Sequence, residues 1–288
     1  MMRKSFFADF RSSLKDLEDV LDLVFNRFPA YLLVRTLAPL RISPNALTAM
    51  SFLLTCVATV FIVRDRPGWG ALFIYLKVVF DCSDGQMARF TQTTTRFGRF
   101  YDELADISGQ FIIFGGIGAV MMREGFSWTI LLGLAASLLF MGADITLFQN
   151  FRTLYLRTSE GKAAPPPRTR KTLFIAIDGL NALREATLRL VPLPAISRAA
   201  EKNGWSEERI ESIRSAFRRR FRPMVYLFSL FAGTSHLFAI AILAMLGRLE
   251  SLFAVFIVWY NALMAVAVAF QVVNAAAFER RYMRDLSP

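Results

Sequence analysis

Side chains that bind metals through sulfur or nitrogen are scarce in this chain, which has two cysteines, Cys56 and Cys82, and one histidine among 288 residues. Both cysteines lie in apolar stretches, so a cystine framework and a cysteine-based zinc site are excluded. The N-terminal segment also lacks the unbroken apolar core of a cleavable signal peptide, because charges are scattered through it. Membrane insertion is therefore expected to depend on internal apolar segments.

Apolar residues are abundant: 55% of the chain is hydrophobic, 14% is aromatic, and the mean hydropathy is +0.40. These values exclude a disordered chain and a soluble disulfide-stapled domain. About 20 mostly apolar residues are needed to cross a hydrocarbon layer about 30 Å thick. Six segments meet this requirement, at residues 46–63, 68–90, 102–122, 127–148, 223–246 and 250–278. The sequence predicts an all-α, polytopic integral membrane protein with six transmembrane helices.

The formal charge of +11 fits either nucleic-acid binding or a membrane protein whose cytoplasmic loops face anionic lipid. Six spans place both termini and the even-numbered connections on one side. That side carries 29 lysines and arginines, 16 of them in the long connection at residues 149–222, whereas the other side carries 4. Without the long connection the ratio is still 13 to 4, which predicts that both termini are cytoplasmic. We therefore expect a membrane lipid partner and no nucleic-acid partner.

Residues 1–43 form the first predicted region, a cytoplasmic juxtamembrane segment. Its apolar residues recur at three- and four-residue steps while acidic residues occupy the other face, which is the pattern of an amphipathic helix. The apolar face comprises Leu14, Leu17, Leu21, Val24, Phe25 and Phe28. We expect this helix to lie along the cytoplasmic membrane interface, and packing on the long connection is the alternative.

Three further regions follow. Residues 44–150 are predicted to hold spans one to four, residues 151–222 a cytoplasmic helical insert between spans four and five, and residues 223–288 the last two spans and the tail. The role of the insert cannot be read from the sequence.

The insert has its own internal pattern. Residues 163–167 (Ala-Ala-Pro-Pro-Pro) are a turn-forming break, residues 172–191 are an apolar stretch, and Ser206 followed by two glutamates predicts a helix start. The insert ends in a basic run at residues 218–222. This run predicts a lipid-surface anchor, with a pocket for an anionic substrate as the alternative.

Four aspartates lie at the predicted cytoplasmic ends of the second and third spans: Asp81, Asp84, Asp102 and Asp106. An ionised carboxylate at membrane depth costs several kcal/mol unless it is paired or binds a metal, so each is a functional candidate. With about 100° per residue, the first two share one helix face and the last two are a turn apart on the next helix. Small residues beside them permit close helix contact: Gly85, Ala88, Gly98 and Gly109. Two acidic stripes can therefore face each other.

Four confined negative charges repel one another and favour protonation unless cations compensate. Two divalent ions would balance them, and ligation by oxygen alone favours Mg²⁺, with Mn²⁺ or Ca²⁺ as alternatives. A pair of such ions suits phosphoryl or phosphodiester transfer. Arg89, one turn beyond Gly85, is placed to bind a phosphate oxygen. The residues alone leave two other interpretations of the four aspartates open. They could snorkel to the interface or cap helices, or they could line a cation path across the membrane.

This stretch resembles the signature of the CDP-alcohol phosphotransferases (CDP-alcohol phosphatidyltransferases), which reads Asp-x-x-Asp-Gly-x-x-Ala-Arg, about eight residues, and Gly-x-x-x-Asp-x-x-x-Asp. The eight specified positions are all present within 26 residues, as Asp81, Asp84, Gly85, Ala88, Arg89, Gly98, Asp102 and Asp106. Six spans with the motif at the cytoplasmic side of the second and third are also similar to the family. The first 40 residues and the insert lie outside the resemblance.

The resemblance implies a reaction in which an alcohol attacks a phosphate of a CDP-linked donor and gives a phosphodiester and CMP, with Mg²⁺ or Mn²⁺. It implies that Asp81, Asp84 and Asp102 hold metal. Asp106 would be the general base and also touch the second of two metal ions. The positions that correspond to nucleotide contacts are Gly85, Ala88 and Arg89.

Upstream, residues 43–48 (Ser-Pro-Asn-Ala-Leu-Thr) resemble the Pro-Asn-x-x-Thr stretch that lies near the cytidine in this family. The resemblance implies nucleotide contacts from Asn45 and Thr48, whereas the residues alone indicate a helix start. Three polar residues in the spans receive no role from the motif: Lys77, which is one turn before Asp81 and can pair with it or snorkel, Asp144 and His236.

We therefore expect a membrane enzyme of phospholipid biosynthesis with its active site facing the cytoplasm. The favoured reaction transfers phosphatidyl from CDP-diacylglycerol to a soluble alcohol such as glycerol phosphate, inositol phosphate or serine, because Arg152, Arg157 and the 218–222 run suit a phosphorylated acceptor. One alternative transfers the head group of CDP-choline or CDP-ethanolamine to diacylglycerol, and another is a divalent-cation transporter. The resemblance also implies a homodimer. The sequence does not identify donor or acceptor.

Overall fold

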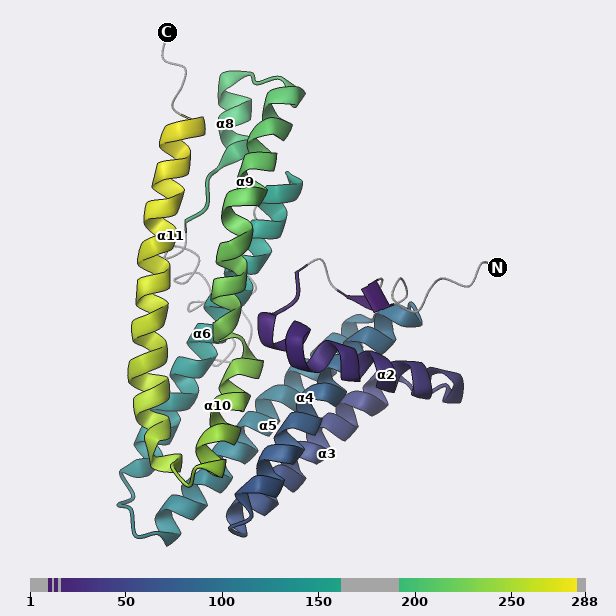
Figure 1. Ribbon diagram of the computed structural model, residues 1–288, viewed down its shortest axis with the longest axis vertical. Coiled ribbons are helices and arrows are strands. Elements are labelled where there is room, and N and C mark those ends of the chain that lie inside the picture. The colour runs from purple at the N-terminus through teal and green to yellow at the C-terminus, as the bar shows by residue number, and fades with distance from the viewer. Residues whose placement is uncertain (1–9, 12, 15–16, 162–191, 284–288) are drawn as a thin grey trace, which may run out of the picture. The chain divides into compact units, whose positions relative to one another are not determined.

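A computed structural model describes residues 10–11, 13–14, 17–161 and 192–283, and every regular element within these ranges is helical (Figure 1). The all-α prediction is confirmed for this part of the chain. Contacts divide the protein into two compact units, one of residues 1–139 and 233–257 and the other of residues 140–232 and 258–288. The expected break at 163–167 and the apolar stretch at 172–191 lie outside the described residues.

Helices α3 (Pro44–Val63), α4 (Pro67–Phe90) and α5 (Arg96–Arg123) form the centre of the first unit. Each begins with a sequence signal. The Ser43 side chain accepts from the Ala46 N–H at 3.2 Å, α4 has a proline in its first turn, and the Thr95 side chain accepts from the Gly98 N–H at 2.9 Å. These three helices correspond to the first three expected spans.

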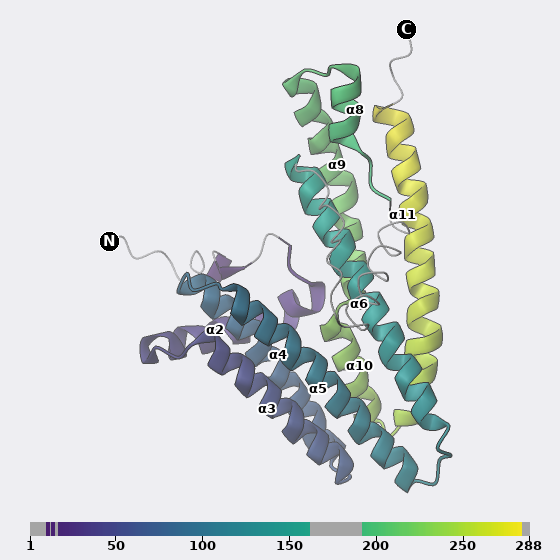
Figure 2. The same ribbon diagram turned by 180° about the vertical axis from the view of Figure 1, so that it is seen from behind.

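Small residues let these helices approach closely, as Figure 2 shows for the three side by side. A Cβ added at Gly70 of α4 would lie 2.6 Å from Ile62 Cγ1 of α3, and one added at Gly109 of α5 would lie 3.2 Å from Thr55 Cγ2. A Cβ at Gly116 would overlap the methyl group of Thr59. The glycines thus let α4 and α5 each pack closely on α3.

The N-terminal segment packs on α4 through η1 (Asp22–Asn26) and α2 (Arg27–Leu37), followed by η2 (Ala38–Leu40). The expectation of one amphipathic helix beginning near Leu14 is wrong, because residues 14 and 17–19 are not helical. Long-range contacts explain the difference: the Ser13 carbonyl accepts from Arg89 Nε at 2.9 Å, and Glu18 pairs with Arg27 at 2.7 Å. Tertiary contacts here outweigh helix periodicity.

Helix α10 (Gly233–Met245) completes the first unit by packing on α4. Its Thr234 hydroxyl donates to Asp22 Oδ1 at 2.8 Å, which ties it to the N-terminal segment. Two short elements follow α10: η4 (Leu249–Ser251) and the start of η5 (Ala254–Trp259).

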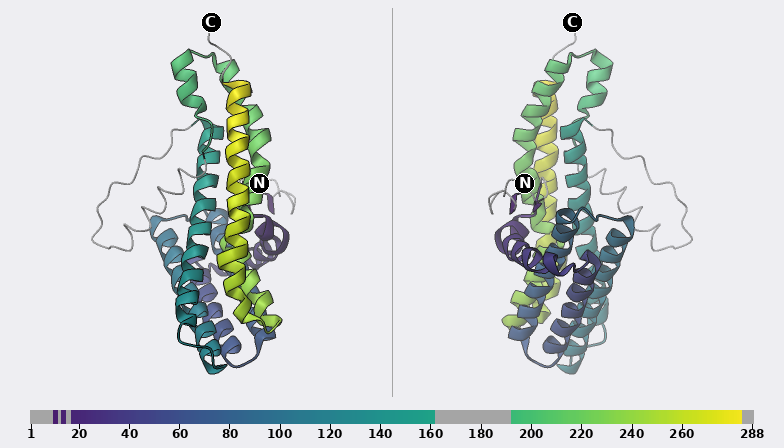
Figure 3. Two further views of the ribbon diagram at one scale, coloured as in Figure 1. Left: turned by 90° about the vertical axis from the view of Figure 1, so that its left-hand side faces the viewer. Right: turned by 90° about the vertical axis from the view of Figure 1, so that its right-hand side faces the viewer.

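The second unit contains most of α6 (Ile130–Glu160), together with α8 (Ile196–Asn203), α9 (Glu207–Phe228), η3 (Ser229–Phe231) and α11 (Tyr260–Tyr282). The predicted helix start at Ser206 is confirmed, since its side chain accepts from the Arg209 N–H at 3.4 Å. Figure 3 shows α6, α9 and α11 running alongside one another. Aromatic contacts fill the space between them, from Phe151, Tyr155, Phe217, Phe221, Phe228 and Phe278.

In the described ranges, four helical stretches are long and apolar enough to cross a membrane: α3, α5, α6 and Leu249–Tyr282. A fifth exists if α9, η3 and α10 form one broken span. The expected fifth span at 223–246 is interrupted: α9 continues through Pro223, and the helix breaks at Ala232, whose backbone is extended with ψ 162°. Helix α4 occupies the place of the expected second span but carries Lys77, Asp81 and Asp84.

Candidate active site

Three of the four motif carboxylates are brought together at the ends of α4 and α5 that adjoin the 91–95 connection. Oxygen atoms of Asp81, Asp102 and Asp106 all lie within 4.8 Å of one another, and each residue is half-buried. The two α5 residues are one helical turn apart and share a face, whereas Asp81 reaches them from α4. Carboxylate oxygens at this separation can share a divalent cation such as Mg²⁺, Mn²⁺ or Ca²⁺.

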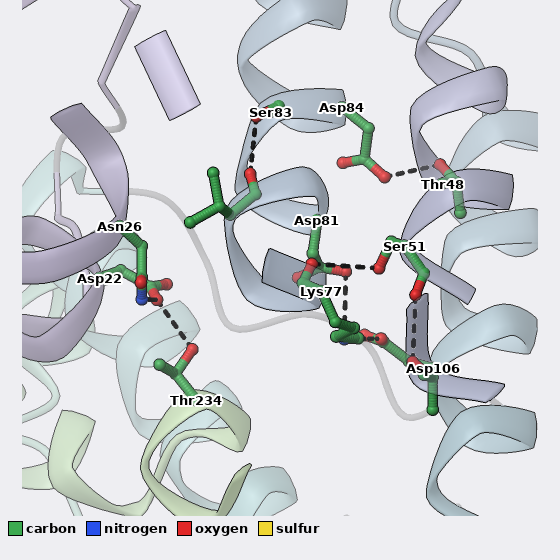
Figure 4. A network of polar contacts seen from close by, with 12 residues as sticks. Asp22, Asn26, Thr48, Ser51, Lys77, Asp81, Ser83, Asp84, Asp106 and Thr234 are labelled. Carbon is green, nitrogen blue, oxygen red and sulfur yellow. Dashed lines mark hydrogen bonds and ion pairs between the residues drawn. The ribbon is translucent and has the colours of Figure 1, made fainter. Parts of the chain in front are cut away.

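Asp84, the fourth motif carboxylate, is buried and is not part of this group. Its Oδ2 accepts from Thr48 Oγ1 of α3 at 2.6 Å, as Figure 4 shows. Thr48 is itself buried and its hydroxyl also lies 3.3 Å from the Pro44 carbonyl. The structure thus fixes the orientation of Asp84 through a residue that the motif comparison had placed near the nucleotide.

Lys77 is a component of the site that had no role in the sequence analysis. Its Nζ lies 2.7 Å from Asp106 Oδ1 and 3.4 Å from Asp81 Oδ1, with its side chain only 10% exposed. Figure 4 shows it directed at both carboxylates. The four-residue spacing to Asp81 signals one of these pairs, but no local pattern signals the pair with Asp106 on another helix.

Gly85 and Arg89 lie one turn apart on α4. A Cβ added at Gly85 would meet only Arg89 Nη1, at 3.4 Å, so the guanidinium folds back over the glycine. Arg89 donates from Nε to the Ser13 carbonyl, while its Nη2 is buried and has no hydrogen-bond partner among the described residues. Ala88 is partly exposed on the same turn.

Asn45 lies in the first turn of α3 and reaches the start of α5. A Cβ added at Gly98 would lie 3.2 Å from Asn45 Oδ1 and 3.1 Å from Thr95 Oγ1. Gly98 lies four residues before the metal-ligand candidate Asp102. A larger residue at Gly98 would therefore press on Asn45. The motif glycine keeps the two helix starts close together.

Behind α4, a buried polar network joins it to the N-terminal segment. Arg27 pairs with Glu18 at 2.7 Å, lies 3.8 Å from Asp22 and donates to the Cys82 carbonyl at 3.3 Å. The Gln86 side chain donates to the Arg27 carbonyl at 3.3 Å. Helix periodicity did not indicate this network, because it shows only that the acidic residues lie on the face opposite the apolar one.

Asp144 of α6 and His236 of α10 are both buried, and neither belongs to the carboxylate group. The His236 ring packs edge-on against Phe256 with the centroids 5.1 Å apart. This contact is typical of a packing residue.

Comparison with known proteins places the motif in context. The family profile described as CDP-alcohol phosphatidyltransferase matches residues 41–190, slightly more than half of the chain. An archaetidylinositol phosphate synthase of Pyrococcus horikoshii is 31% identical over 100 residues, which cover 34% of this chain and 53% of that protein. A bifunctional IPC transferase and DIPP synthase of Aquifex aeolicus is 28% identical over 88 residues, which cover 31% of this chain and 20% of that protein. The chain thus spans about half of the first relative and a fifth of the second.

Proposed function

The chain belongs to the CDP-alcohol phosphatidyltransferase family, and from this premise we propose that it transfers phosphatidyl from CDP-diacylglycerol to an alcohol and releases CMP. The observation that carries the proposal is the convergence of Asp81, Asp102 and Asp106 within 4.8 Å, because three oxygen ligands at the end of an apolar helix bundle suit a metal-bound diphosphate. Several apolar helices make this a membrane protein, as the lipid donor requires.

The metal site is proposed to hold two Mg²⁺ ions, with Mn²⁺ able to replace them. The donor set fits, because it consists of carboxylate oxygens with no thiol or imidazole in the group. Asp81, Asp84 and Asp102 are the proposed ligands, and Asp106 would also help to hold the second ion. When bound, the ions neutralise the diphosphate and the charge that develops on the leaving CMP.

The side chains around the ions have separate proposed roles. Asp106 is the proposed general base: it accepts the proton of the acceptor hydroxyl as that oxygen attacks the phosphorus bearing diacylglycerol and the bond to CMP breaks. Thr48 keeps Asp84 in one orientation by its 2.6 Å hydrogen bond. Arg89 supplies its buried Nη2 to the nucleotide diphosphate, above the small Gly85.

Nucleotide recognition is assigned to the surrounding small and polar residues. Asn45 and Thr48 contact the cytidine from the first turns of α3, and Ala88 lines the diphosphate beside Arg89. The close approach of Asn45 to the Gly98 turn supports this assignment, since it puts an amide side chain between two helices that carry site residues.

For the membrane layout we retain six spans, with α4 as the second. Its charged side chains lie against α3 and α5 rather than on an outer surface, since Lys77 pairs with Asp106 and Asp84 with Thr48. Polar groups satisfied in this way are tolerated at membrane depth. The excess of basic residues on one side supports a cytoplasmic position for the site and both termini.

The N-terminal segment at residues 1–43 is proposed to rest on the cytoplasmic interface. Val24 and Phe25 are 63% and 51% exposed and Phe28 is 44% exposed, whereas Asp22 and Arg27 on the same helical stretch are buried. An exposed apolar face of this kind suits the headgroup boundary of a bilayer. In this layout residues 44–150 form the catalytic spans, residues 151–222 form a cytoplasmic insert, and residues 223–288 form the last two spans and the tail. We propose that the protein is a homodimer.

A phosphorylated alcohol is the favoured acceptor class. The Pyrococcus horikoshii relative is named for a lipid phosphate product, which supports this class. The basic run at 218–222 gives less support, because Arg218 is held by Glu211 and the Ser159 carbonyl and Arg220 by Asn274. Arg152 and Arg157 of the insert are still proposed to favour an acceptor that carries a phosphate. Head-group transfer from CDP-choline or CDP-ethanolamine to diacylglycerol is the alternative reaction.

The test is release of labelled CMP by the purified protein in detergent. It is offered CDP-diacylglycerol or CDP-choline with Mg²⁺ and a panel of alcohols that includes glycerol phosphate, inositol phosphate, serine and diacylglycerol. We expect CMP and a lipid product from CDP-diacylglycerol, and loss of both in Asp81→Asn and Asp106→Asn. Flux of divalent cations across vesicles without CMP release would instead identify a transporter.

A further inference from the structure

Lys77 makes its contacts with two carboxylates that the proposed function already uses. Its Nζ lies between Oδ1 of Asp106, at 2.7 Å, and Oδ1 of Asp81, at 3.4 Å. A lysine in the middle of an apolar helix is costly unless its charge is paired. Here the Lys77 side chain is 10% exposed, whereas the side chains of its partners Asp81 and Asp106 are 30% and 41% exposed. The Lys77 ammonium and a metal ion would therefore both bind the carboxylates of Asp81 and Asp106.

The position of Lys77 is fixed from the backbone outward. It stands one helical turn before Asp81, and its carbonyl accepts from the Ser51 hydroxyl of α3 at 3.3 Å. The side chain therefore extends along α4 toward the group and crosses to Asp106 on α5 (Figure 4). A flexible surface lysine would have no such anchoring on two neighbouring helices.

We propose that Lys77 is a built-in cation of the carboxylate group, which occupies the Asp81–Asp106 side in the metal-free protein and competes with a divalent ion for it. Asp81, Asp102 and Asp106 converge on one site, and Lys77 already places one positive charge against two of them. The remaining charge attracts a first ion more strongly than a second. The free protein is therefore expected to bind its second ion weakly until the diphosphate of the nucleotide adds negative charge.

This inference rests on the proposed function for the metal site, but it is tested without catalysis. Mn²⁺ binding to the purified protein in detergent, with no nucleotide, is followed by electron paramagnetic resonance. Lys77→Met removes the charge and keeps an unbranched apolar chain, whereas Lys77→Arg keeps the charge. A matched control is Arg123→Met, which removes one positive charge from the ion pair with Asp65 at the other ends of α3 and α5.

We expect Lys77→Met to bind Mn²⁺ about tenfold more tightly than the wild type at the weaker site, because one repelling charge is gone. Lys77→Arg and Arg123→Met should bind as the wild type does. If Lys77→Met does not fold, Lys77→Gln replaces it and the same increase is expected. Unchanged or weaker Mn²⁺ binding in the folded neutral variant would overturn the proposal.

The two proposals fail in different ways. If neutral variants bind Mn²⁺ more tightly but the wild type releases no CMP from a CDP-linked donor, Lys77 keeps its assignment and the proposed reaction is wrong. If the wild type releases CMP but the neutral variants bind Mn²⁺ no better, the reaction stands and the assignment of Lys77 is wrong. Tighter Mn²⁺ binding in Arg123→Met would also overturn the assignment, because the loss of a positive charge far from the site would then have the same effect as the loss of Lys77.

Discussion

The buried ion pair between Arg27 and Glu18 makes a sharp prediction for stability. The two side chains are 5% and 4% exposed and their charged atoms are 2.7 Å apart. Removing one partner of such a pair costs about 3–5 kcal/mol, because the other charge stays buried without compensation. In Arg27→Met the buried Glu18 carboxylate loses its 2.7 Å ion pair, and the hydrogen bond to the Cys82 carbonyl is lost as well. We expect a loss in this range.

Glu18→Gln should cost less, about 1–3 kcal/mol, because Arg27 keeps Asp22 at 3.8 Å and the Cys82 carbonyl. The double variant should be more stable than the sum of the two single losses, since it leaves neither charge alone. The assay is reversible unfolding in mixed detergent micelles, followed by circular dichroism. Arg35→Met, an exposed arginine on the same helix, is the control and should change stability by no more than about 0.5 kcal/mol. A loss below about 1 kcal/mol in Arg27→Met, or strict additivity, would refute the reasoning.

The remaining predictions concern the site and the helix contacts. Thr48→Val should lower the rate of CMP release while Thr48→Ser keeps it, because only the serine can donate to Asp84; equal rates in the two variants would contradict this. Gly116→Val should destabilise the protein by about 1–3 kcal/mol in a thermal-unfolding assay through overlap with α3, whereas Gly115→Ala, with no atom within 4 Å of the added Cβ, should not. Chelation should lower the midpoint of thermal unfolding and Mn²⁺ should restore it, and Asp102→Asn should lack this response; an equal response in the variant would count against the ligand assignment.

Sequence reasoning predicted the parts of the site that follow from helix geometry. Asp102 and Asp106 share a face because they are four residues apart, and the Asp81 carboxylate on α4 faces them because α4 and α5 both pack on α3. The helix starts at Ser43 and Ser206 were also predictable, since each has a side chain that caps the first turn. Such local rules need no knowledge of distant contacts.

The contacts that sequence reasoning missed join residues far apart in the chain. Lys77 pairs with Asp106 across 29 positions, and Arg89 donates to Ser13 across 76. The Arg89–Ser13 contact and the pair of buried Glu18 with Arg27 explain why the N-terminal helix begins later than its periodicity indicates. Local periodicity gives the faces of a helix, but it does not say which polar groups a neighbouring helix will pair with.

The proposed metal site uses the carboxylates of α4 and α5 to hold a divalent ion for the diphosphate of a CDP-linked donor. It is tested most directly by anomalous diffraction from crystals soaked in Mn²⁺ with a CDP-linked donor. We expect an anomalous peak about 2.0–2.2 Å from oxygens of Asp81 and Asp102, with a diphosphate oxygen among its ligands. Bound nucleotide with no anomalous peak at these carboxylates would contradict it.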